Sequence, residues 1–284
     1  MSLIALSTGS LYSYGLNRVF ELAREIGFDG IEVLIDQRPD TFQPHYLRRL
    51  QQEQGLPILA LHSPFFPAAS WEKGDLACVR RSVDLAQEVG AGVVIAHLPR
   101  RIRGVMVQFL WRHSHRLVLP IPWGGDREWL AFIQDGLAHL EAVTGVVIAV
   151  ENMPARRIGP LRLNGCWLNT PQEMEVIPHI TLDTTHLGTW DYDVLAAYEQ
   201  LKERVAHVHL SNFNGKEHRL LDDGHLPLAQ LLERLGADGY GGIISFETHP
   251  NNLKAEDEGQ VRANLRRSLD FCRQHLARGV GGRR

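Results

Sequence analysis

The sequence predicts a (β/α)8 barrel, and two observations carry that prediction. Eight short apolar runs rich in β-branched residues alternate with amphipathic stretches along a chain of 284 residues. Near-continuous apolar strands that alternate with helices indicate a parallel sheet covered on both faces. Eight such units in a chain a little longer than about 250 residues match the usual size of this barrel. A doubly wound open sheet is the alternative, and it is disfavoured because no GxGxxG motif follows the first strand.

The predicted strands share a core of Val, Ile, Leu and Ala. In order along the chain they are 3–8, 30–35, 57–62, 92–97, 146–151, 179–183, 205–210 and 242–247. Apolar residues at helical spacing predict helices over 17–26, 76–89, 129–143, 194–201, 226–235 and 261–276. We therefore expect one barrel domain over 1–277, followed by a disordered tail rich in Gly and Arg over 278–284.

The composition excludes several classes of protein. The 30 Lys and Arg against 33 Asp and Glu leave a net charge of −3, which gives no general attraction to nucleic acid or membrane. No apolar run reaches the roughly 18–20 residues that span a bilayer, and the N-terminus lacks the features of an export signal. The three cysteines are widely spaced, so neither a disulfide framework nor a thiolate zinc cluster is expected. These features are typical of a cytoplasmic protein without a membrane partner.

Two connections are longer than the others and rich in arginine. A basic insertion covers about 98–126 after the fourth predicted strand, and a loop over 153–170 after the fifth contains Arg156 and Arg157. Loops of this length are either lids and binding loops or solvated surface insertions, and the sequence leaves both alternatives open. Because the arginine fork suits phosphate, we expect Arg156 and Arg157 to contact substrate.

Six predicted strands have an ionisable residue at the last position or the one before it, and these residues share one parity along their strands. In the fifth strand, Glu151 has the parity of the small Ala149, whereas Ile148 and Val150 lie on the other parity. The large apolar parity is suited to packing on helices, so the other parity points into the barrel. We expect these six side chains at the carboxyl-terminal mouth, where barrel enzymes keep their active sites. They are His62, His97, Glu151, Asp183, His209 and Glu247.

The residue types at this mouth predict a divalent-metal site. Several carboxylates buried together need a counter-charge. Imidazole and carboxylate without thiolate is the ligand set of zinc or manganese. Three further candidate ligands lie just beyond the strand ends, namely His186, Asp223 and His225. Five of the 14 histidines thus fall in one predicted metal cage.

With these residues the chain resembles the xylose isomerase-like TIM barrels, a superfamily that includes endonuclease IV (AP endonuclease family 2) and the sugar-phosphate isomerases and epimerases. The resemblance extends from the first strand to about Leu276. In the isomerase branch, a Glu, an Asp, a His and a Glu at the ends of the fifth to eighth strands hold one divalent ion. The matching residues here are Glu151, Asp183, His209 and Glu247.

Endonuclease IV holds three zinc ions and uses five additional ligands. The resemblance implies that role for His62, His97, His186, Asp223 and His225. The surrounding motifs depart from those of endonuclease IV. The fifth strand continues Glu151-Asn-Met-Pro rather than small-Gly-Gln-Gly, and the seventh ends His209-Leu-Ser-Asn rather than His-Leu-Asn-Asp. The resemblance therefore supports the metal cage, whereas these departures place DNA, and abasic DNA above all, in doubt as a substrate.

Two reactions fit this cage, and they differ in the number of ions. Three zinc ions leave a positive surplus that suits an anionic phosphoester, and they would activate the water that hydrolyses it. One manganese or magnesium ion with three carboxylates suits a neutral sugar-like substrate. Glu151 and Glu247 would then move a proton on either side of an enediolate, with His186 holding a substrate oxygen.

The additional ligands favour the first reaction. In a single-metal isomerase, no chemical role is left for four residues, namely His62, His97, Asp223 and His225. We therefore expect an endonuclease IV-like phosphoester or phosphodiester hydrolase with a trinuclear zinc site and a small phosphorylated or sugar-like substrate. A sugar or sugar-phosphate isomerase or epimerase is the alternative, and a non-catalytic metal-binding module is the third. Glu32 is either a substrate contact or a buried partner of a histidine, and His249 follows Glu247 closely enough to touch substrate.

Overall fold

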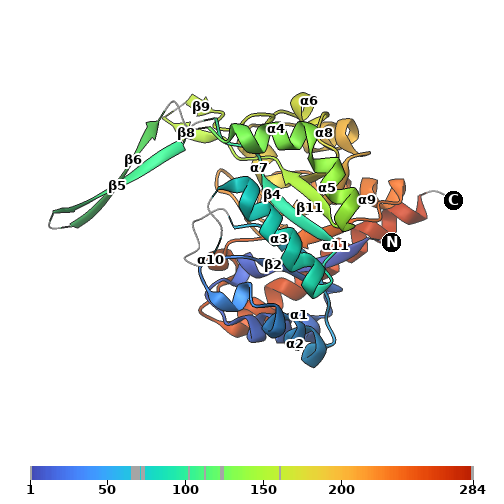
Figure 1. Cartoon of the computed structure of the whole chain (residues 1–284). Helices are drawn as coiled ribbons and strands as arrows, with labels where there is room; N and C mark the ends of the chain where they lie inside the picture. Colours follow the sequence, from blue (N-terminus) through green and yellow to red (C-terminus); the bar gives the residue numbers. More distant parts are fainter. Residues whose placement is uncertain are drawn as a thin grey trace.

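Eight parallel strands close into a barrel in the order β1-β12-β11-β10-β7-β4-β3-β2 in the computed structural model of the chain (Figure 1). The structure describes residues 2–64, 71, 74–101, 103–111, 113–121, 125–159 and 161–282. The barrel strands are β1 (Leu3–Ser7), β2 (Gly30–Leu34), β3 (Ile58–His62), β4 (Val93–His97), β7 (Val147–Glu151), β10 (Ile180–Asp183), β11 (Val205–Leu210) and β12 (Ile243–Phe246). Each coincides with a strand expected from the sequence, so the predicted (β/α)8 TIM-barrel fold is confirmed.

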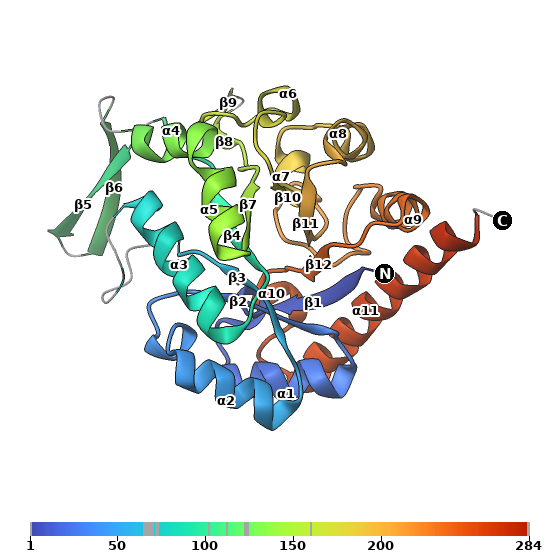
Figure 2. The same cartoon turned by 45° about the vertical axis from the view of Figure 1, so that its right-hand side comes forward.

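Helices surround the strands on the outside of the barrel (Figure 2). The longer ones are α1 (Leu16–Ile26), α2 (Pro44–Gln54), α3 (Asp75–Val89), α4 (Arg127–Asp135), α5 (Leu137–Thr144), α8 (Val194–Leu201), α9 (Leu228–Asp238) and α11 (Glu258–Gly281). Shorter helical turns occupy the connections at η1 (Thr8–Leu11), η2 (Pro39–Thr41), α6 (Pro171–Met174), α7 (Thr184–Thr189) and α10 (Pro250–Leu253). Among the helices in the described part of the chain, none combines the length and hydropathy needed to cross a membrane.

Two helical segments differ from the sequence-based expectation, each for a local reason. The helix expected over 129–143 is divided into α4 and α5 at Gly136, which ends the first helix and precedes the second. A Cβ at this position would lie 2.5 Å from the ring of Phe132, so a larger residue would require that ring to move. The apolar pattern predicts no helix over α2, because only Leu47 and Leu50 are buried there.

The predicted basic insertion forms a hairpin that extends away from the barrel. β5 (Arg103–Trp111) and β6 (His113–Ile121) pair antiparallel along their whole length as a separate sheet. In both views this hairpin lies outside the ring of helices (Figures 1 and 2). Residues 102, 112 and 122–124 of the predicted insertion lie outside the described residues.

The two ends of the insertion are joined by Arg100 and Asp126. The carboxylate of Asp126 accepts hydrogen bonds from the backbone N and the Nε of Arg100 at 3.1 and 3.0 Å. The backbone N of Asp126 donates in return to the carbonyl of Arg100 at 2.9 Å. Asp126 is 4% exposed, whereas the side chain of Arg100 is 41% exposed. These hydrogen bonds hold together the two points at which the hairpin leaves and rejoins the barrel.

The last helix continues into the segment that was expected to be disordered. α11 ends at Gly281, and residues 283–284 lie outside the described residues. α9 and α11 approach closely at two glycines, since a Cβ on Gly279 would collide with the carbonyl of Glu233 and one on Gly236 with that of Leu276. This packing orders the chain past residue 277, so the expected start of disorder at 278 is corrected.

The strands sort their side chains by parity. Ile148 and Val150 are fully buried in the main core, which the strands share with the helices. Ala149 belongs instead to a small interior cluster with Ala5 and Ala60. Val93, Ile95 and Ile243 complete this interior cluster, and the polar side chains at the carboxyl ends of the strands share its inward parity.

Candidate metal centre

The strand-end side chains predicted from the sequence lie at one end of the barrel. β3, β4, β7 and β10 end at His62, His97, Glu151 and Asp183, while His209 is the penultimate residue of β11 and Glu247 follows β12. The strand register places His97 beside Glu151 and Asp183 beside His209. His97 and Glu247 keep side-chain exposures of 25% and 18%, whereas the other four are nearly or fully buried. The cluster therefore opens to solvent on the side of these two residues.

A central group of four side chains has the geometry of a metal site. Glu151, Asp183, His209 and Glu247 each offer one ligand atom, and these atoms all lie within 4.8 Å of one another. The Nδ1 atom of His209 lies 2.8 Å from Glu151 Oε1, 3.2 Å from Glu247 Oε2 and 3.7 Å from Asp183 Oδ2. Three carboxylates thus converge on one imidazole nitrogen.

The carboxylate of Glu151 faces two groups of histidines. Its Oε1 atom is directed at His209, whereas its Oε2 atom lies 3.4 Å from His62 Nε2 and 3.2 Å from His97 Nε2. His62, Glu151 and His209 form a second group of ligand atoms within 4.8 Å of one another, which His97 does not join. Glu151 therefore contacts the central group with one oxygen, and His62 and His97 with the other.

Backbone carbonyls orient two of the histidines. The Nδ1 atom of His62 lies 2.8 Å from the carbonyl of Ser63, and that of His186 lies 2.8 Å from the carbonyl of Asn152. A carbonyl only accepts hydrogen bonds, so Nδ1 carries the hydrogen in both rings and Nε2 of the neutral ring has a lone pair. This is how proteins commonly orient an imidazole that binds a metal.

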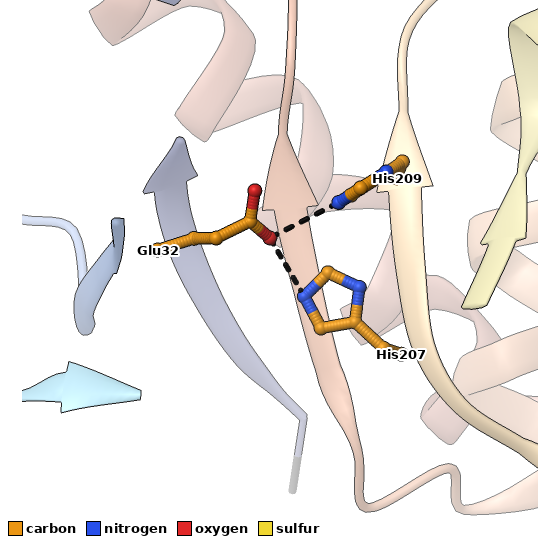
Figure 3. Close-up of side chains that lie close together, drawn as sticks. All are labelled: Glu32, His207 and His209. Carbon is orange, nitrogen blue, oxygen red and sulfur yellow. Dashed lines mark hydrogen bonds and ion pairs between the residues drawn. The ribbon is translucent and has the colours of Figure 1, made fainter. Parts of the chain in front are cut away.

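Glu32 orients His209 from below the centre. Figure 3 shows the Glu32 carboxylate between the imidazoles of His207 and His209, with Oε2 3.1 Å from His209 Nε2 and 3.0 Å from His207 Nε2. All three residues are fully buried, and β1 and β12 separate β2 from β11, so Glu32 reaches across the barrel interior. Because Glu32 accepts from Nε2 of His209, the Nδ1 atom of that ring faces the three carboxylates.

The electrostatics of the centre favour a bound cation. Burial and the carboxylates of Glu151 and Glu247 raise the pKa of Asp183 well above its ordinary value. Burial opposes a charge on His209, but Glu247, Glu32 and Glu151 together raise its pKa well above the ordinary value. The carboxylates thus favour the charged form of His209, which offsets part of their negative charge.

The residues present fit a divalent ion. Glu151 Oε2, Asp183 Oδ2 and Glu247 Oε2 are buried atoms that have no hydrogen-bond partner in the described structure. Buried carboxylate oxygens are rarely left without a partner unless an ion or water occupies the site. Oxygen and imidazole nitrogen are ligands of zinc, manganese and magnesium, so this donor set suits the divalent ions expected from the sequence.

Asp183 is held by both its backbone and its side chain. Its Oδ1 atom accepts a hydrogen bond from the backbone N of His186 at 2.8 Å and caps α7. The side-chain amide of Asn152 accepts from the backbone N of Asp183 at 2.8 Å and donates to its carbonyl at 3.0 Å. These contacts leave Oδ2 directed at the centre. The start of α7 also sets the position of His186, where burial lowers the pKa to about 3.

Two predicted ligands lie apart from these groups. Asp223 forms an ion pair with Arg219 and accepts a hydrogen bond from Asn214 Nδ2 at 2.9 Å. His225 is exposed, and its ring packs against Phe213 with 5.7 Å between the ring centres. Neither residue belongs to any group of three or more candidate ligands among the described residues. Their role as ligands stays a prediction.

The predicted substrate contacts lie at different depths. Arg156 and Arg157 are exposed on β8 (Arg156–Ile158), which pairs with β9 (Leu161–Leu163) beyond the end of β7. His249 is exposed and caps α10 by accepting a hydrogen bond from Asn251 N at 3.2 Å. Glu32 instead lies in the interior against His207 and His209, as expected for a buried partner of a histidine. Contact of these four residues with substrate stays a prediction.

Three residues of the centre were not assigned from the sequence. Asn152 follows Glu151 directly, and His207 shares the inward parity of His209. Closeness in sequence to a predicted ligand was the only feature that could have indicated either residue. His218 lies in the loop after β11, and its ligand atom lies within 4.8 Å of those of Asp183 and His186. No periodic pattern marks a loop residue, which is why the sequence does not reveal it.

Comparison with known proteins agrees with this architecture. A family model described as a xylose isomerase-like TIM barrel matches residues 20–275. An uncharacterised protein of Mycobacterium tuberculosis is 25% identical over 299 residues, which cover 97% of this chain and 98% of that protein.

Two solved structures share the fold at low sequence identity. A 3-keto-D-glucoside 4-epimerase from E. coli is 20% identical, with a TM-score of 0.66 and coverage of 96% of this chain and 100% of that one. An AP endonuclease, family 2, from Brucella melitensis is 21% identical, with a TM-score of 0.62 and coverage of 88% and 94%. One of these structures is an epimerase and the other an AP endonuclease, so both branches of the superfamily are represented. At this sequence identity the comparison shows that the fold is shared, and it shows nothing about function.

Proposed function

The chain belongs to the xylose isomerase-like TIM barrel family, and from this premise we propose that it is a divalent-metal-dependent phosphoester hydrolase. Members of this superfamily are enzymes that include isomerases, epimerases and AP endonucleases of family 2. The observation that carries the proposal is the position of Glu151 between two groups of histidines. One oxygen faces His209, and the other faces His62 and His97.

This arrangement supports more than one ion. A single-metal isomerase needs only the four central ligands and leaves His62 and His97 without a chemical role. Both of these side chains direct Nε2 at the Glu151 oxygen that has no hydrogen-bond partner. Two or more divalent ions held by three carboxylates leave a positive surplus, which attracts and holds an anionic phosphoester.

The residues of the chain have separate roles in this proposal. Zinc ions held by the centre would supply Lewis acidity, lowering the pKa of water to about 7 and stabilising charge on the leaving oxygen. Glu247 is the partly exposed carboxylate of the centre, so it is placed to accept a proton from the attacking water. His186 is neutral near pH 7 because burial lowers its pKa to about 3, and its Nε2 lone pair serves as an acceptor or ligand. Arg156 and Arg157 would hold phosphate oxygens.

The test compares substrate classes on one zinc-loaded preparation. We expect hydrolysis of bis(p-nitrophenyl) phosphate, followed by p-nitrophenolate absorbance, and no activity after chelation. His62→Ala should lower kcat by roughly 100-fold, since the loss of even an outer-shell partner of a metal ligand costs about 10–100-fold. His139→Ala on the exposed face of α5 is the matched control. Turnover of ketoses without cleavage of phosphoesters or abasic DNA would overturn the proposal.

A second candidate is a single-metal sugar or sugar-phosphate epimerase or isomerase. It is favoured by the central group, which is a complete four-ligand site by itself. Glu151 and Glu247 would then exchange a proton with a carbon next to a carbonyl. In this case, ketoses should incorporate deuterium from the solvent at that carbon, and His62→Ala should leave the metal content at one ion per chain.

A further inference from the structure

We propose that the hairpin of β5 and β6 is a dimerisation arm, and that it binds the same hairpin of a second copy of this chain. In the dimer, one face of each two-stranded sheet packs against the same face of the other. This assembly is independent of the reaction at the metal centre, so it holds whether the substrate is a phosphoester or a sugar.

The arm is a sheet of only two strands. β5 and β6 pair with each other over nine residues each, as a sheet separate from the barrel. At about 3.4 Å per residue, each strand is roughly 30 Å long. The arm lies outside the ring of helices in both views (Figures 1 and 2). A two-stranded hairpin is at best marginally stable in water, and a further layer over an apolar face is what stabilises it.

The two faces of the arm differ in composition. Alternate residues of a strand belong to opposite faces, and residues directly opposite each other in the register belong to the same face. One face has polar residues only towards its ends, with Arg103 at the base and His113 and His115 near the tip. The other face has Gln108 and Arg116 at its middle. The seven apolar residues of the first face, which we call the apolar arm face, are Val105, Val107, Phe109, Trp111, Leu117, Leu119 and Ile121.

The apolar arm face is large enough for a stable dimer interface. Phe and Trp bury about 150–250 Å² each. An aliphatic side chain buries about 60–120 Å², if its transfer free energy is converted at about 25 cal/mol per Å². The apolar residues of one arm therefore offer roughly 600–1,100 Å². Stable interfaces bury about 800 Å² on each partner, so the stacking of two arms meets this requirement.

A second arm is the partner that the chain itself offers for this face. Elsewhere in the described structure, the exposed large apolar side chains are spread over the barrel, and no element there has more than two of them. They are Leu3, Tyr12, Val143, Leu161, Leu163, Val176 and Val280. Two identical arms have the same length and the same apolar face, so a two-fold axis brings the two faces together and buries both. The polar residues at the ends of each face would then form the rim that interfaces usually have.

The distribution of charge along the arm favours this partner over a lipid bilayer. The sequence that joins the two strands is Trp111-Arg-His-Ser-His, so a tip that entered the bilayer first would carry a cation and polar groups into it. The aliphatic residues of the apolar arm face lie farther back, at Val105 and Val107 on β5 and from Leu117 to Ile121 on β6. An apolar surface that extends along the arm suits a partner of equal length.

Sedimentation velocity of the full chain over a range of concentrations tests the arm. We expect a dimer with twice the chain mass of 32.0 kDa, which dissociates on dilution. Val107→Glu places a charge in the apolar arm face and should raise the dissociation constant of the dimer by roughly 100-fold or more, because an unpaired charge buried in an interface is strongly unfavourable. Gln108→Glu is the matched control, since it introduces the same charge one residue away on the other face. It should leave the dissociation constant nearly unchanged.

A second variant separates loss of the interface from loss of the fold. The chain in which a Gly-Ser linker replaces residues 103–121 should be monomeric and should keep its metal content. If the unaltered chain is monomeric at micromolar concentration, or if either Val107→Glu or the linker variant remains as dimeric as the unaltered chain, the inference is overturned. An equal effect of Gln108→Glu would overturn the assignment of the face. A monomer that co-sediments with phosphatidylserine vesicles, and loses this binding in Val107→Glu, would identify a membrane as the partner and would overturn the inference as well.

Discussion

At the scale of single residues, the centre holds carboxylates close together in the interior, an arrangement that costs stability unless a positive charge balances them. Asp183 is the clearest case, because it is fully buried and two other carboxylates lie close to it. Its other contacts offset only part of this cost: Oδ1 caps α7, Asn152 bonds to its backbone, and the Nδ1 atom of His209 lies 3.7 Å from Oδ2. A binding residue of this kind costs stability until its ligand arrives.

We predict that Asp183→Asn stabilises the metal-free protein near pH 8 and abolishes binding of the central ion. The amide removes the charge that burial, Glu151 and Glu247 disfavour, and it keeps an oxygen to cap α7. A gain of about 1 kcal/mol would raise Tm by roughly 2–4 °C in a chain of this size. Thermal unfolding in the presence of a chelator measures it.

The pH dependence of this gain has a definite sign. The pKa of Asp183 is raised in the folded state, so the folded protein keeps the proton at a pH where the unfolded chain has lost it. The cost therefore grows as the pH rises from the ordinary pKa to the raised one and is complete above it, so the advantage of Asn shrinks as the pH falls from the raised pKa towards the ordinary one. Asp135→Asn, at an exposed position of α4, is the control. A lower Tm of Asp183→Asn near pH 8 would contradict the explanation.

At the scale of elements, parity along the strands carried most of the information about the site. Glu151 and Asp183 end β7 and β10, and the barrel brings such ends together whatever the loops do. Asn152 and His218 had no comparable signal, because their positions depend on how two connections fold back over the mouth. The division of α4 from α5 at Gly136 was likewise a local event that helical periodicity could not resolve.

The hairpin of β5 and β6 allows a prediction about the independence of the barrel. Replacing residues 103–121 with a short Gly-Ser linker should change Tm by no more than a few degrees and leave the metal content unaltered. The reason is that β5 and β6 form a sheet of their own, and Arg100 and Asp126 close its base. Thermal unfolding and elemental analysis check both values.

The matching control keeps the hairpin and removes the contact between Arg100 and Asp126 at its base. Asp126→Ala removes the side-chain hydrogen bonds that join Arg100 to Asp126 and, among the described residues, leaves the Arg100 side chain paired with Asp75 alone, so it should lower Tm more than the deletion does. If the linker variant loses metal or fails to fold, the hairpin is part of the site and not an addition to it.

At the scale of the whole molecule, the net charge of −3 hides an uneven distribution. Three carboxylates are held together at the mouth, and the exposed arginines of β8 lie beyond them. In the absence of metal, the neighbouring carboxylates raise the pKa of His209 and favour its charged form. We therefore expect the binding of a divalent ion at this centre to depend on pH.

We predict that removal of the metal lowers Tm by roughly 10 °C. A ligand present at about 1,000 times its Kd stabilises the native state by about 4 kcal/mol, and each kcal/mol corresponds to about 2–4 °C here. Scanning calorimetry before and after chelation measures the change, and added zinc should reverse it. An unchanged Tm would show that the buried carboxylates are balanced by protons alone.

The sequence by itself determined the barrel and the residues at the ends of its strands. The reason is that the alternation of apolar runs, and the parity within each run, are local properties of the chain. Only the tertiary structure decided which of those residues face one another. It placed Glu151 between two groups of histidines, Glu32 beneath His209, and His218 beside Asp183. Such contacts join residues far apart in the chain, so no local pattern specifies them.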